Sequence, residues 1–581
     1  MAVGLKDRLP SLIPASAASW TAALARLTGR QLREEWFGSP PHLWSIARPR
    51  SEGQAAAPRD FRPADIERGR AVLGGVFAFD GLELQVGAGG DPWNRPSPSR
   101  AFAIQLHRMD WLRDLAASGE AGPRTALALV QGWDRVFGQW NSFAWSPAVL
   151  SRRVFNLACN MKRLCARVPA EDADVLLASL ARQARHLLLL HDGPRWAAER
   201  AASAALAGAV LAGRAGKPLM AKGLARLEPA LKGAVLPDGC HASRCPEAGL
   251  ELLLDLLTLD DALLQLGLPP APELVRAVDR LGAGLRFFAL ADGRLASFQG
   301  GEQSQSARVI AAAAFGETDA APGGGLAAPP SPSAPHGGYE KLAGRRLQLI
   351  VDAAPPAQGA WSPTACAQPL AIEVLAGGDR LITGSGWSSR APDAQGLRLT
   401  PAASTLTLAE ASAGAPIAGL RGRTLGQRLE GGARAVTLRR QDTATGAWLE
   451  LSHDGWVPVF GLVHERRLFM AHAIDELRGE DLVRPAGEDV PKGRRIAQFA
   501  VRFHLQPGVR ARMEEDQRTV LLCGASGEGW RLRHDAAEIT LEPSLHLQGG
   551  RPRRTSQIVL RSLIRQDRTG RIRWKIAAEG A

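Results

Sequence analysis

The sequence predicts an α+β protein with two main domains, an N-terminal (α/α) toroid of helical hairpins followed by a C-terminal antiparallel β-sandwich. Apolar residues recur with a period of about 3.6 in the first half of the chain and alternate with polar residues in the second half. Between the halves, residues 316–338 are rich in Pro, Gly, Ala and Ser, as is typical of a linker or a long exposed loop. A chain of 581 residues is also too long for one ordinary core.

The first half shows an amphipathic helical pattern. Residues 101–119 place Phe102, Leu106 and Met109 at helical spacing, and residues 123–139 repeat the pattern. Short turns with Pro or Gly separate the later segments, and such turns make neighbouring helices antiparallel. We therefore expect helical hairpins that curl into a toroid. Further helices are expected near residues 147–167, 172–191, 195–213, 216–232, 247–266 and 272–289.

The second half consists of short alternating segments separated by turn signals. Many short strands without helices between them favour an antiparallel sandwich. The expected strands lie in RLQLIVDAA, LAIEVLAGGDRLIT, LRLTPAASTLTLAE, AVTLRRQD, AWLELSHDGW, RRLFMAHA, IAQFAVRFHL, RTVLLCG, GWRLRHDAAEITLE, SQIVLRSLI and IRWKIAA. The chain is thus divided into an N-terminal extension, the toroid, a Pro/Gly/Ala-rich linker and the sandwich. Their expected bounds are 1–64, 65–300, 301–337 and 338–581.

The composition indicates a globular protein with excess positive charge. Apolar residues make up 45% of the chain, and the formal net charge is +13. A basic surface favours acidic partners, such as acidic polysaccharide, lipid headgroups or nucleic acid. Because no nucleic-acid-binding motif accompanies the charge, we expect no nucleic-acid partner.

Cysteine content and hydropathy bear on the compartment. The chain has 6 cysteines and no Cys-x-x-Cys pair, so a disulfide framework is not expected. The most apolar stretch, residues 202–213, is too short to span a bilayer, and residues 1–20 lack the apolar run of a signal peptide. We therefore expect a cytoplasmic protein without a membrane span.

Residues 236–257, LPDGCHASRCPEAGLELLLDLL, join a polar turn to a leucine-rich helix. The pattern Cys-His-x-x-x-Cys is a weak indication of a metal site, because no second cluster lies nearby. The indication of a capped helix start is stronger, because Ser243 precedes Pro246 at an early helical position and acidic residues follow in the first turn.

The same stretch resembles a family motif of the form Asp-Gly-Gly-His-x-x-Arg-Asn-Pro followed by a leucine-rich helix. Other stretches along nearly the whole chain resemble further motifs of that family. They are DPWNRPSPSRAFAIQLHRMDWLRDL, WDRVFGQWNSFAWSPAVLSRRVFNL, LRFFALADGRLASFQGG, HGGYEKLAGRRLQLIVDAAPP, LSHDGWVPVFGLVHERRL and SGEGWRLRHDAAEITLE. On these motifs, the chain is identified as a member of the heparinase II/III-like family, in the form common in alphaproteobacteria.

The resemblance implies β-elimination on a uronic-acid-containing polysaccharide, with no cofactor. In that reaction the sugar carboxylate is neutralised, a Tyr or His base removes the C5 proton, and an acid protonates the leaving glycosidic oxygen. The candidate catalytic residues are His241, Tyr339 and His453. The candidate substrate-binding residues are Arg244, Glu251, Trp93 and Trp140.

Each candidate also has a structural interpretation. His241 could form a helix-terminus hydrogen bond, and Arg244 could pair with Glu247 or Glu251 instead of a substrate carboxylate. Tyr339 could anchor the end of the linker. His453 could belong to a turn, because Asp454 and Gly455 follow it, and could face the interdomain cleft. Tryptophans at helical spacing usually belong to the core.

The sequence departs from the family where the chemistry is expected. Ala248 aligns with a catalytic Tyr of the better-known lyases, and Cys245 replaces the Asn of the family motif. The positions that hold zinc in metal-bearing relatives are Cys366, Gly384 and Ala403 here. Since one cysteine without partner ligands is a poor zinc site, we expect no bound metal.

Two functions therefore remain open. The first is an active lyase of acidic polysaccharide that binds its polymer in the groove between the domains. The second is a non-catalytic relative, a carbohydrate-binding or assembly protein that keeps the cleft but not the chemistry. Because some relatives are exported, the periplasm or cell envelope is the alternative compartment.

Overall fold

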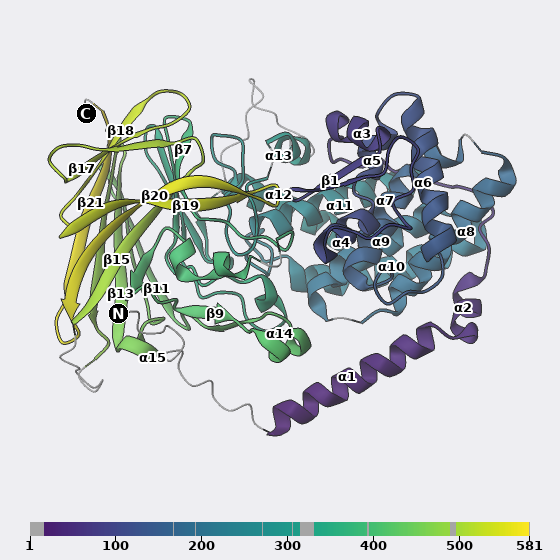
Figure 1. Ribbon diagram of the computed structural model, residues 1–581, viewed down its shortest axis with the longest axis horizontal. Coiled ribbons are helices and arrows are strands. Elements are labelled where there is room, and N and C mark those ends of the chain that lie inside the picture. Colours follow the sequence, from purple (N-terminus) through teal and green to yellow (C-terminus); the bar gives the residue numbers. More distant parts are fainter. Residues whose placement is uncertain are drawn as a thin grey trace.

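The computed structural model shows two lobes side by side, one helical and one made of β-sheets (Figure 1). The predicted fold class, a helical toroid followed by an antiparallel β-sandwich, is confirmed. The structure describes residues 17–166, 168–191, 193–269, 271–304, 306–313, 331–391, 394–487 and 496–579.

The helical lobe buries the apolar stripes that the sequence predicted. Its helices are α3 (Ile66–Leu73), α4 (Arg100–Arg108), α5 (Leu112–Ala116), α6 (Ala121–Phe137), α7 (Pro147–Cys165), α8 (Ala170–Leu189), α9 (Ala197–Val210), α10 (Gly213–Ala234), α11 (Pro246–Gln265) and α12 (Pro272–Phe288). Helices adjacent in the chain pack against each other, as α7 does with α8, α9 with α10 and α11 with α12. Several begin with Pro in the first turn, where the missing N–H leaves no helical hydrogen bond unmade.

The single helix predicted for residues 101–119 is wrong, because the structure has two helices there, α4 and α5. Met109 ends α4 in the left-handed backbone region, with φ 58°. Leu106 and Leu112 on either side of the break are both buried. The apolar period therefore continues across a break that the side-chain pattern does not reveal.

Five elements lie where an N-terminal extension, the helical toroid or a linker was expected. They are α1 (Ala17–Phe37), α2 (Pro40–Ala47), the hairpin β1 (Val76–Phe79) and β2 (Leu82–Gln85), and α13 (Ser306–Ala313). In Figure 1, α1 runs below the helical lobe, and α2 packs on α8, where His42 Nε2 lies 3.0 Å from His186 Nδ1. Residues 314–330 of the expected linker lie outside the described residues.

The sandwich consists of two antiparallel sheets with an apolar core between them. The nine-stranded sheet has the order β19 (Glu538–Gln548), β20 (Arg551–Arg565), β15 (Ile496–Leu505), β7 (Asp379–Thr383), β6 (Ile372–Ala376), β5 (Leu347–Asp352), β4 (Tyr339–Ala343) and β3 (Ser333–Ala334), with β8 (Leu406–Leu408) paired to β15. The eight-stranded sheet has the order β11 (Val436–Asp442), β12 (Gly446–His453), β13 (Leu462–Ala471), β14 (Glu476–Pro485), β21 (Gly570–Ala578), β18 (Gly529–His534), β17 (Thr519–Cys523) and β16 (Arg510–Met513). Smaller elements are β9 (Gly414–Pro416), α14 (Gly419–Leu425), β10 (Leu429–Gly431) and α15 (Val457–Phe460).

The strand predicted within residues 397–410 is mostly wrong, because short 3-10 turns precede the brief strand β8. The guanidinium of Arg398 is buried and donates to Ala365 O at 2.6 Å and to Gln427 O at 2.7 Å. These contacts hold the segment as a loop across the end of the sheet. Pro401 also has no N–H to offer to a neighbouring strand.

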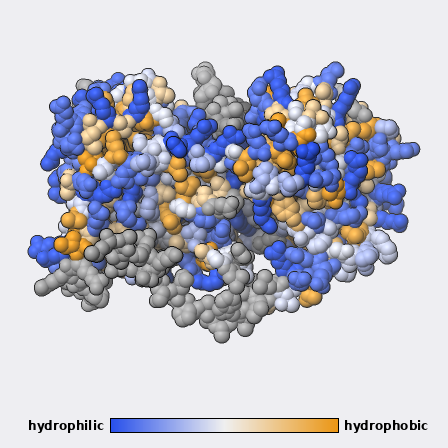
Figure 2. Space-filling view, in the orientation of Figure 1, coloured by the Kyte–Doolittle hydropathy of each residue, from blue (hydrophilic) through white to orange (hydrophobic). Residues whose placement is uncertain are grey.

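The nine-stranded sheet is the one that faces the helical lobe. Lys341 Nζ on β4 donates to Ala289 O at 3.0 Å, just beyond α12. Arg380 on β7 pairs with Asp292 at 3.0 Å. Hydrophilic side chains cover much of both lobes in the view of Figure 2. None of the helices in the described residues is long and apolar enough to cross a membrane.

Candidate functional site

His241 lies in a turn before α11, at the junction of the two domains, and it is almost enclosed. The residue is 5% exposed, and its Nδ1 lies 2.7 Å from Ser243 Oγ. Trp361 of the sandwich packs its ring against the imidazole at 5.2 Å between centroids. Burial and, secondly, the charge of Arg195 lower the pKa of His241 to about 4. The imidazole is therefore neutral at neutral pH.

The other ring nitrogen of His241, Nε2, is buried and makes no hydrogen bond with any described residue. A cavity adjoins the ring and is lined by Gly239, Gly249, Leu285 and Phe288, among others. Its volume of about 10 Å³ is close to the minimum for one water molecule. A sugar ring does not fit in this space.

Arg244 uses every donor of its guanidinium to join the turn to the sandwich. Nε donates to Gly337 O at 2.7 Å, and Nη1 donates to Ala354 O at 3.1 Å and Pro355 O at 2.7 Å. Nη2 donates to Gly338 O at 2.9 Å and to Asp352 Oδ1 at 2.5 Å. A guanidinium has five N–H donors, so none is left for a sugar carboxylate in this arrangement.

The prediction that Arg244 would otherwise pair with Glu247 or Glu251 is wrong, because its acidic partner is Asp352 of β5. Its backbone lies in the left-handed region, at φ 64°, which is uncommon for a residue other than Gly. This conformation turns the side chain away from α11 and toward the sandwich.

Tyr339, at the start of β4, lies directly beside Arg244. Its hydroxyl donates to Arg244 O at 2.6 Å, and the Arg244 guanidinium carbon lies 4.8 Å from the ring centroid. Phe288 and Phe298 enclose the ring. Burial and the nearby Asp352 charge raise the pKa of Tyr339 well above its usual range. The structure thus brings His241, Arg244 and Tyr339 together, in a packed domain contact.

Glu251 lies farther along α11, in a cluster of charges. It pairs with Arg62 at 3.1 Å and also with Arg308 of α13. Burial alone would raise its pKa, but the charges of Arg308 and Arg62 outweigh burial and hold the pKa of Glu251 well below its usual range. Glu251 therefore joins the N-terminal extension, α11 and α13 as an ionised carboxylate.

His453 lies on β12, apart from the turn of His241. Its Nε2 lies 3.1 Å from His464 Nδ1, and His464 Nε2 lies 2.8 Å from Asp481 Oδ1. All three side chains are buried inside the sandwich. Burial and the neighbouring His464 lower the pKa of His453 well below its usual range. This buried chain of polar groups belongs to the eight-stranded sheet and does not face the domain junction.

The two candidate tryptophans occupy packed positions in the helical lobe. Trp93 is buried, and its Nε1 donates to Leu129 O at 2.9 Å. Trp140 is half-buried and packs on Phe37 of α1, with 6.3 Å between the ring centroids. The hydrogen bonds and ring contacts of these two side chains lie within the helical lobe and α1.

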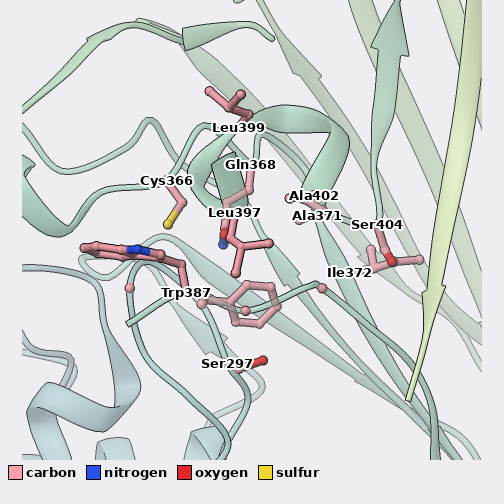
Figure 3. Close-up of a pocket in the computed structure, with 15 residues that line it drawn as sticks. Ser297, Cys366, Gln368, Ala371, Ile372, Trp387, Leu397, Leu399, Ala402 and Ser404 are labelled. Carbon is pink, nitrogen blue, oxygen red and sulfur yellow. The ribbon is translucent and has the colours of Figure 1, made fainter. Parts of the chain in front are cut away.

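The three positions that the family resemblance matched to zinc ligands meet at one cavity. Cys366, Gly384 and Ala403 all line it, together with Trp387 and Ser404 (Figure 3). Burial raises the pKa of Cys366 to about 11, which keeps its thiol protonated. Gly384 and Ala403 offer no side-chain ligand, so these residues do not fit zinc. Within the described residues, no three His, Cys, Asp or Glu side chains are grouped closely enough to hold a metal.

The helix start after the turn is capped, although not by Ser243. The N-cap is Cys245, whose Sγ accepts from Ala248 N at 3.4 Å. Pro246 and Glu247 occupy the first turn, as the sequence predicted. Ser243 serves the turn itself, because its hydroxyl contacts His241 and accepts weakly from Cys245 N at 3.4 Å.

A half-buried group beside His241 was not predicted from the sequence. Arg195 and Trp196 form a 3-10 turn before α9, and this turn contacts the segment of Trp361. Glu199 lies in the first turn of α9, and burial raises its pKa to about 7. The sequence gives Arg195 and Trp196 no special spacing. Only their position opposite the sandwich makes them candidates for ligand contact.

Comparison with known proteins gives three kinds of similarity. Residues 327–575 match the family model described as heparinase II/III-like, C-terminal. The chain is 49% identical over 568 residues to the FtsZ-localized protein C of Caulobacter vibrioides, with 97% of this chain and 96% of that protein covered. Crystal structures of heparinase III and of a heparan sulfate lyase HepC mutant from Pedobacter heparinus share the fold. Heparinase III superposes with a TM-score of 0.68 at 15% identity, over 96% of this chain and 90% of that one. For the HepC mutant the TM-score is 0.56 at 16% identity, over 98% of this chain and 90% of that one.

Proposed function

The chain belongs to the heparinase II/III-like family, and from this premise we propose that it is a non-catalytic member that works as an assembly protein together with FtsZ. The proposal joins two observations. The positions expected to carry lyase chemistry are used for packing, and the similarity to the FtsZ-localized protein C extends over nearly the full length of both chains.

The observation that carries the non-catalytic part is the complete set of hydrogen bonds around Arg244. To bind a uronate, Arg244 would have to leave Asp352, which would then be a buried and unpaired carboxylate. Breaking one partner from a buried ion pair costs about 3–5 kcal/mol. A charge-assisted contact to a sugar carboxylate returns only about 1.5–3 kcal/mol. The balance favours the domain contact over substrate binding.

The candidate acid–base groups support the same proposal. Tyr339 is buried, and its hydroxyl hydrogen is already donated to Arg244 O. His241 Nε2 is buried, and the cavity that His241 lines has room for about one water molecule. A general base must come within hydrogen-bond distance of the proton that it removes. Neither group has space beside it for the C5 atom of a sugar.

A reducing compartment fits the proposal as well. All 6 cysteines are free, and three of them are buried: Cys240, Cys245 and Cys366. Free buried thiols are typical of proteins kept under reducing conditions. We therefore propose the cytoplasm as the compartment in which the protein works.

Two measurements test the proposal. A fluorescent fusion should co-localise with FtsZ in the native organism and become diffuse when FtsZ is depleted. Purified protein mixed with a panel of uronate polymers should give no rise in the ultraviolet absorbance of unsaturated product. A diffuse fusion in normal cells contradicts the assembly role, whereas turnover of any polymer contradicts the non-catalytic role.

Binding of acidic polysaccharide without turnover is the second candidate function. The half-buried Arg195, Trp196 and Trp361 at the domain junction favour it, because a cation beside aromatic faces suits an anionic sugar. Arg195→Ala and Trp361→Ala should weaken the binding of such a polymer, measured by titration calorimetry. Unchanged binding in both variants removes this candidate.

A further inference from the structure

The outer face of the eight-stranded sheet carries an aromatic pair beside a row of cations. Trp448 on β12 and Phe469 on β13 are cross-strand neighbours, with 4.5 Å between their ring centroids. The same row continues with Arg478 on β14, Lys575 on β21 and Arg533 on β18. Because neighbouring strands lie about 4.8 Å apart, these five side chains form one continuous line.

Most of the row is open to solvent, although Phe469 is only 9% exposed, with the Arg478 guanidinium over its ring. Trp448 is 41% exposed and the Arg478 side chain is 58% exposed. Figure 1 shows this sheet, with β17 and β21, at the end of the molecule opposite the helical lobe. Among the described residues, the ion pairs and ring contacts of the row all stay within the sandwich.

The row has more positive than negative charge. Glu476 is the shared partner of two cations, lying 2.5 Å from Arg478 Nη2 and 3.0 Å from Lys575 Nζ. One carboxylate therefore faces two charges, and Arg533 adds a third cation to the line. An acidic partner would neutralise the excess positive charge of the row.

The neighbouring row of side chains on the same face favours a protein partner over an acidic polymer. Its members alternate in sign across five strands: Arg439, Glu450, Arg467, Glu480 and Arg573. A polymer with a negative charge on every unit would meet the glutamates as well as the arginines. A protein segment that mixes acidic, basic and apolar residues can match such a pattern.

We infer that this face is a docking surface for an acidic segment of a partner protein. An apolar residue of the segment packs on Trp448, which Phe469 supports from below, and carboxylates of the segment face Arg478 and Lys575. Exposed Trp and Arg side chains are the residue types that carry most binding energy in protein interfaces. The inference rests on the proposed function, which makes FtsZ the partner to test.

Four variants test the surface by titration with purified FtsZ from the same organism. Trp448→Ala and Arg478→Ala should each raise the dissociation constant about tenfold. Matched controls are Trp44→Ala, on an α2 residue that is 75% exposed, and Arg70→Ala, on an α3 side chain that is 67% exposed. The controls should bind as the wild type does. Added salt should weaken wild-type binding more than binding by Arg478→Ala.

The outcomes separate the docking surface from the proposed function. Wild-type protein that does not bind FtsZ overturns the proposed function and the docking surface with it. Binding that survives both substitutions, or that falls equally in the controls, overturns the docking surface alone. Titration with heparin tests whether the surface binds a polyanion instead of a protein. Loss of heparin binding in Trp448→Ala and Arg478→Ala, with FtsZ binding unchanged, overturns the assignment to a protein partner.

Discussion

Arg244 Nη2 lies 2.5 Å from Asp352 Oδ1, and this ion pair joins the helical domain to the sandwich. Asp352 also accepts from Gln299 Nε2 at 2.6 Å and from Gln368 Nε2 at 3.2 Å. Its two oxygens are thus held by groups from three separate segments of the chain. An arginine in a family motif for carbohydrate chemistry serves here as the centre of a domain contact.

Arg244→Met should lower the free energy of unfolding by about 3–5 kcal/mol, because it leaves Asp352 buried without its cation. Arg244→Lys should lie between this variant and the wild type, since Lys keeps the charge but not the five fixed donors. Urea denaturation of the three proteins measures the difference. A change below about 0.5 kcal/mol in Arg244→Met, the range typical of exposed surface sites, would mean that Arg244 is not needed for the domain contact.

Tyr339→Phe removes the hydrogen bond to Arg244 O and keeps the ring. We expect a loss of about 0.5–1.5 kcal/mol in the free energy of unfolding, the usual net value of one hydrogen bond. Phe298→Leu is a matched packing control, because Phe298 touches the Tyr339 ring and makes no such hydrogen bond. If Tyr339→Phe is as stable as the wild type, the hydroxyl does not anchor the turn.

Acid should destabilise the protein at pH values at which histidines that are neutral and buried in the folded protein become charged in the unfolded chain. Burial lowers the pKa of His241 to about 4, below the usual 6.5, so the unfolded chain binds more protons in this interval. The stability from neutral His241 is fully present above pH 6.5 and is lost as the pH falls toward 4. The shift corresponds to about 3 kcal/mol.

Urea denaturation of the wild type and of His241→Gln at several pH values from neutral to acidic checks this slope. The variant should lose less stability than the wild type between neutral pH and about pH 4, because Gln does not titrate. Other buried histidines, among them His453 and His504, contribute to the slope of both proteins alike, since burial lowers their pKa as well. If the free energy of unfolding falls with pH equally in the two proteins, His241 is not a neutral buried group.

The chain should bind zinc only after its ligand positions are restored. Wild-type protein purified without chelator should contain well below one zinc per chain by elemental analysis. The triple variant Cys366→His, Gly384→Asp, Ala403→His should take up one zinc. A Cβ at Gly384 would lie 3.6 Å from Ala402 O and 4.0 Å from Ala403 Cα, so a side chain fits there. Stoichiometric zinc in the wild type, or none in the triple variant, contradicts the assignment of the cavity.

Periodic patterns in the sequence predicted the fold well because burial of apolar side chains determines both. The helices from α6 to α12 and the long strands β15, β20 and β21 lie where the apolar periods placed them. The break at Met109 and the loop around Arg398 escaped prediction, because one depends on a single backbone angle and the other on distant carbonyl groups.

The site was less predictable for a related reason. The sequence identified the turn of His241 and Arg244 through a family motif, and the structure places Tyr339 beside them. The partner of Arg244 is 108 residues away, and no local pattern marks Asp352 as that partner. For His453 the partner is near in the sequence, because His464 follows 11 residues later. The sequence did not show, however, that both side chains point into the core of the sandwich.

The five hydrogen bonds of Arg244 should also restrict movement between the two domains. A hinge between them would separate the guanidinium from Gly337, Gly338 and Asp352 together, so small rotations are opposed by several bonds at once. The protein should then behave as one rigid spacer with a fixed distance between α11 and the far sheet. A partner bound to that sheet would then stay at a constant distance from a molecule bound to the helical lobe.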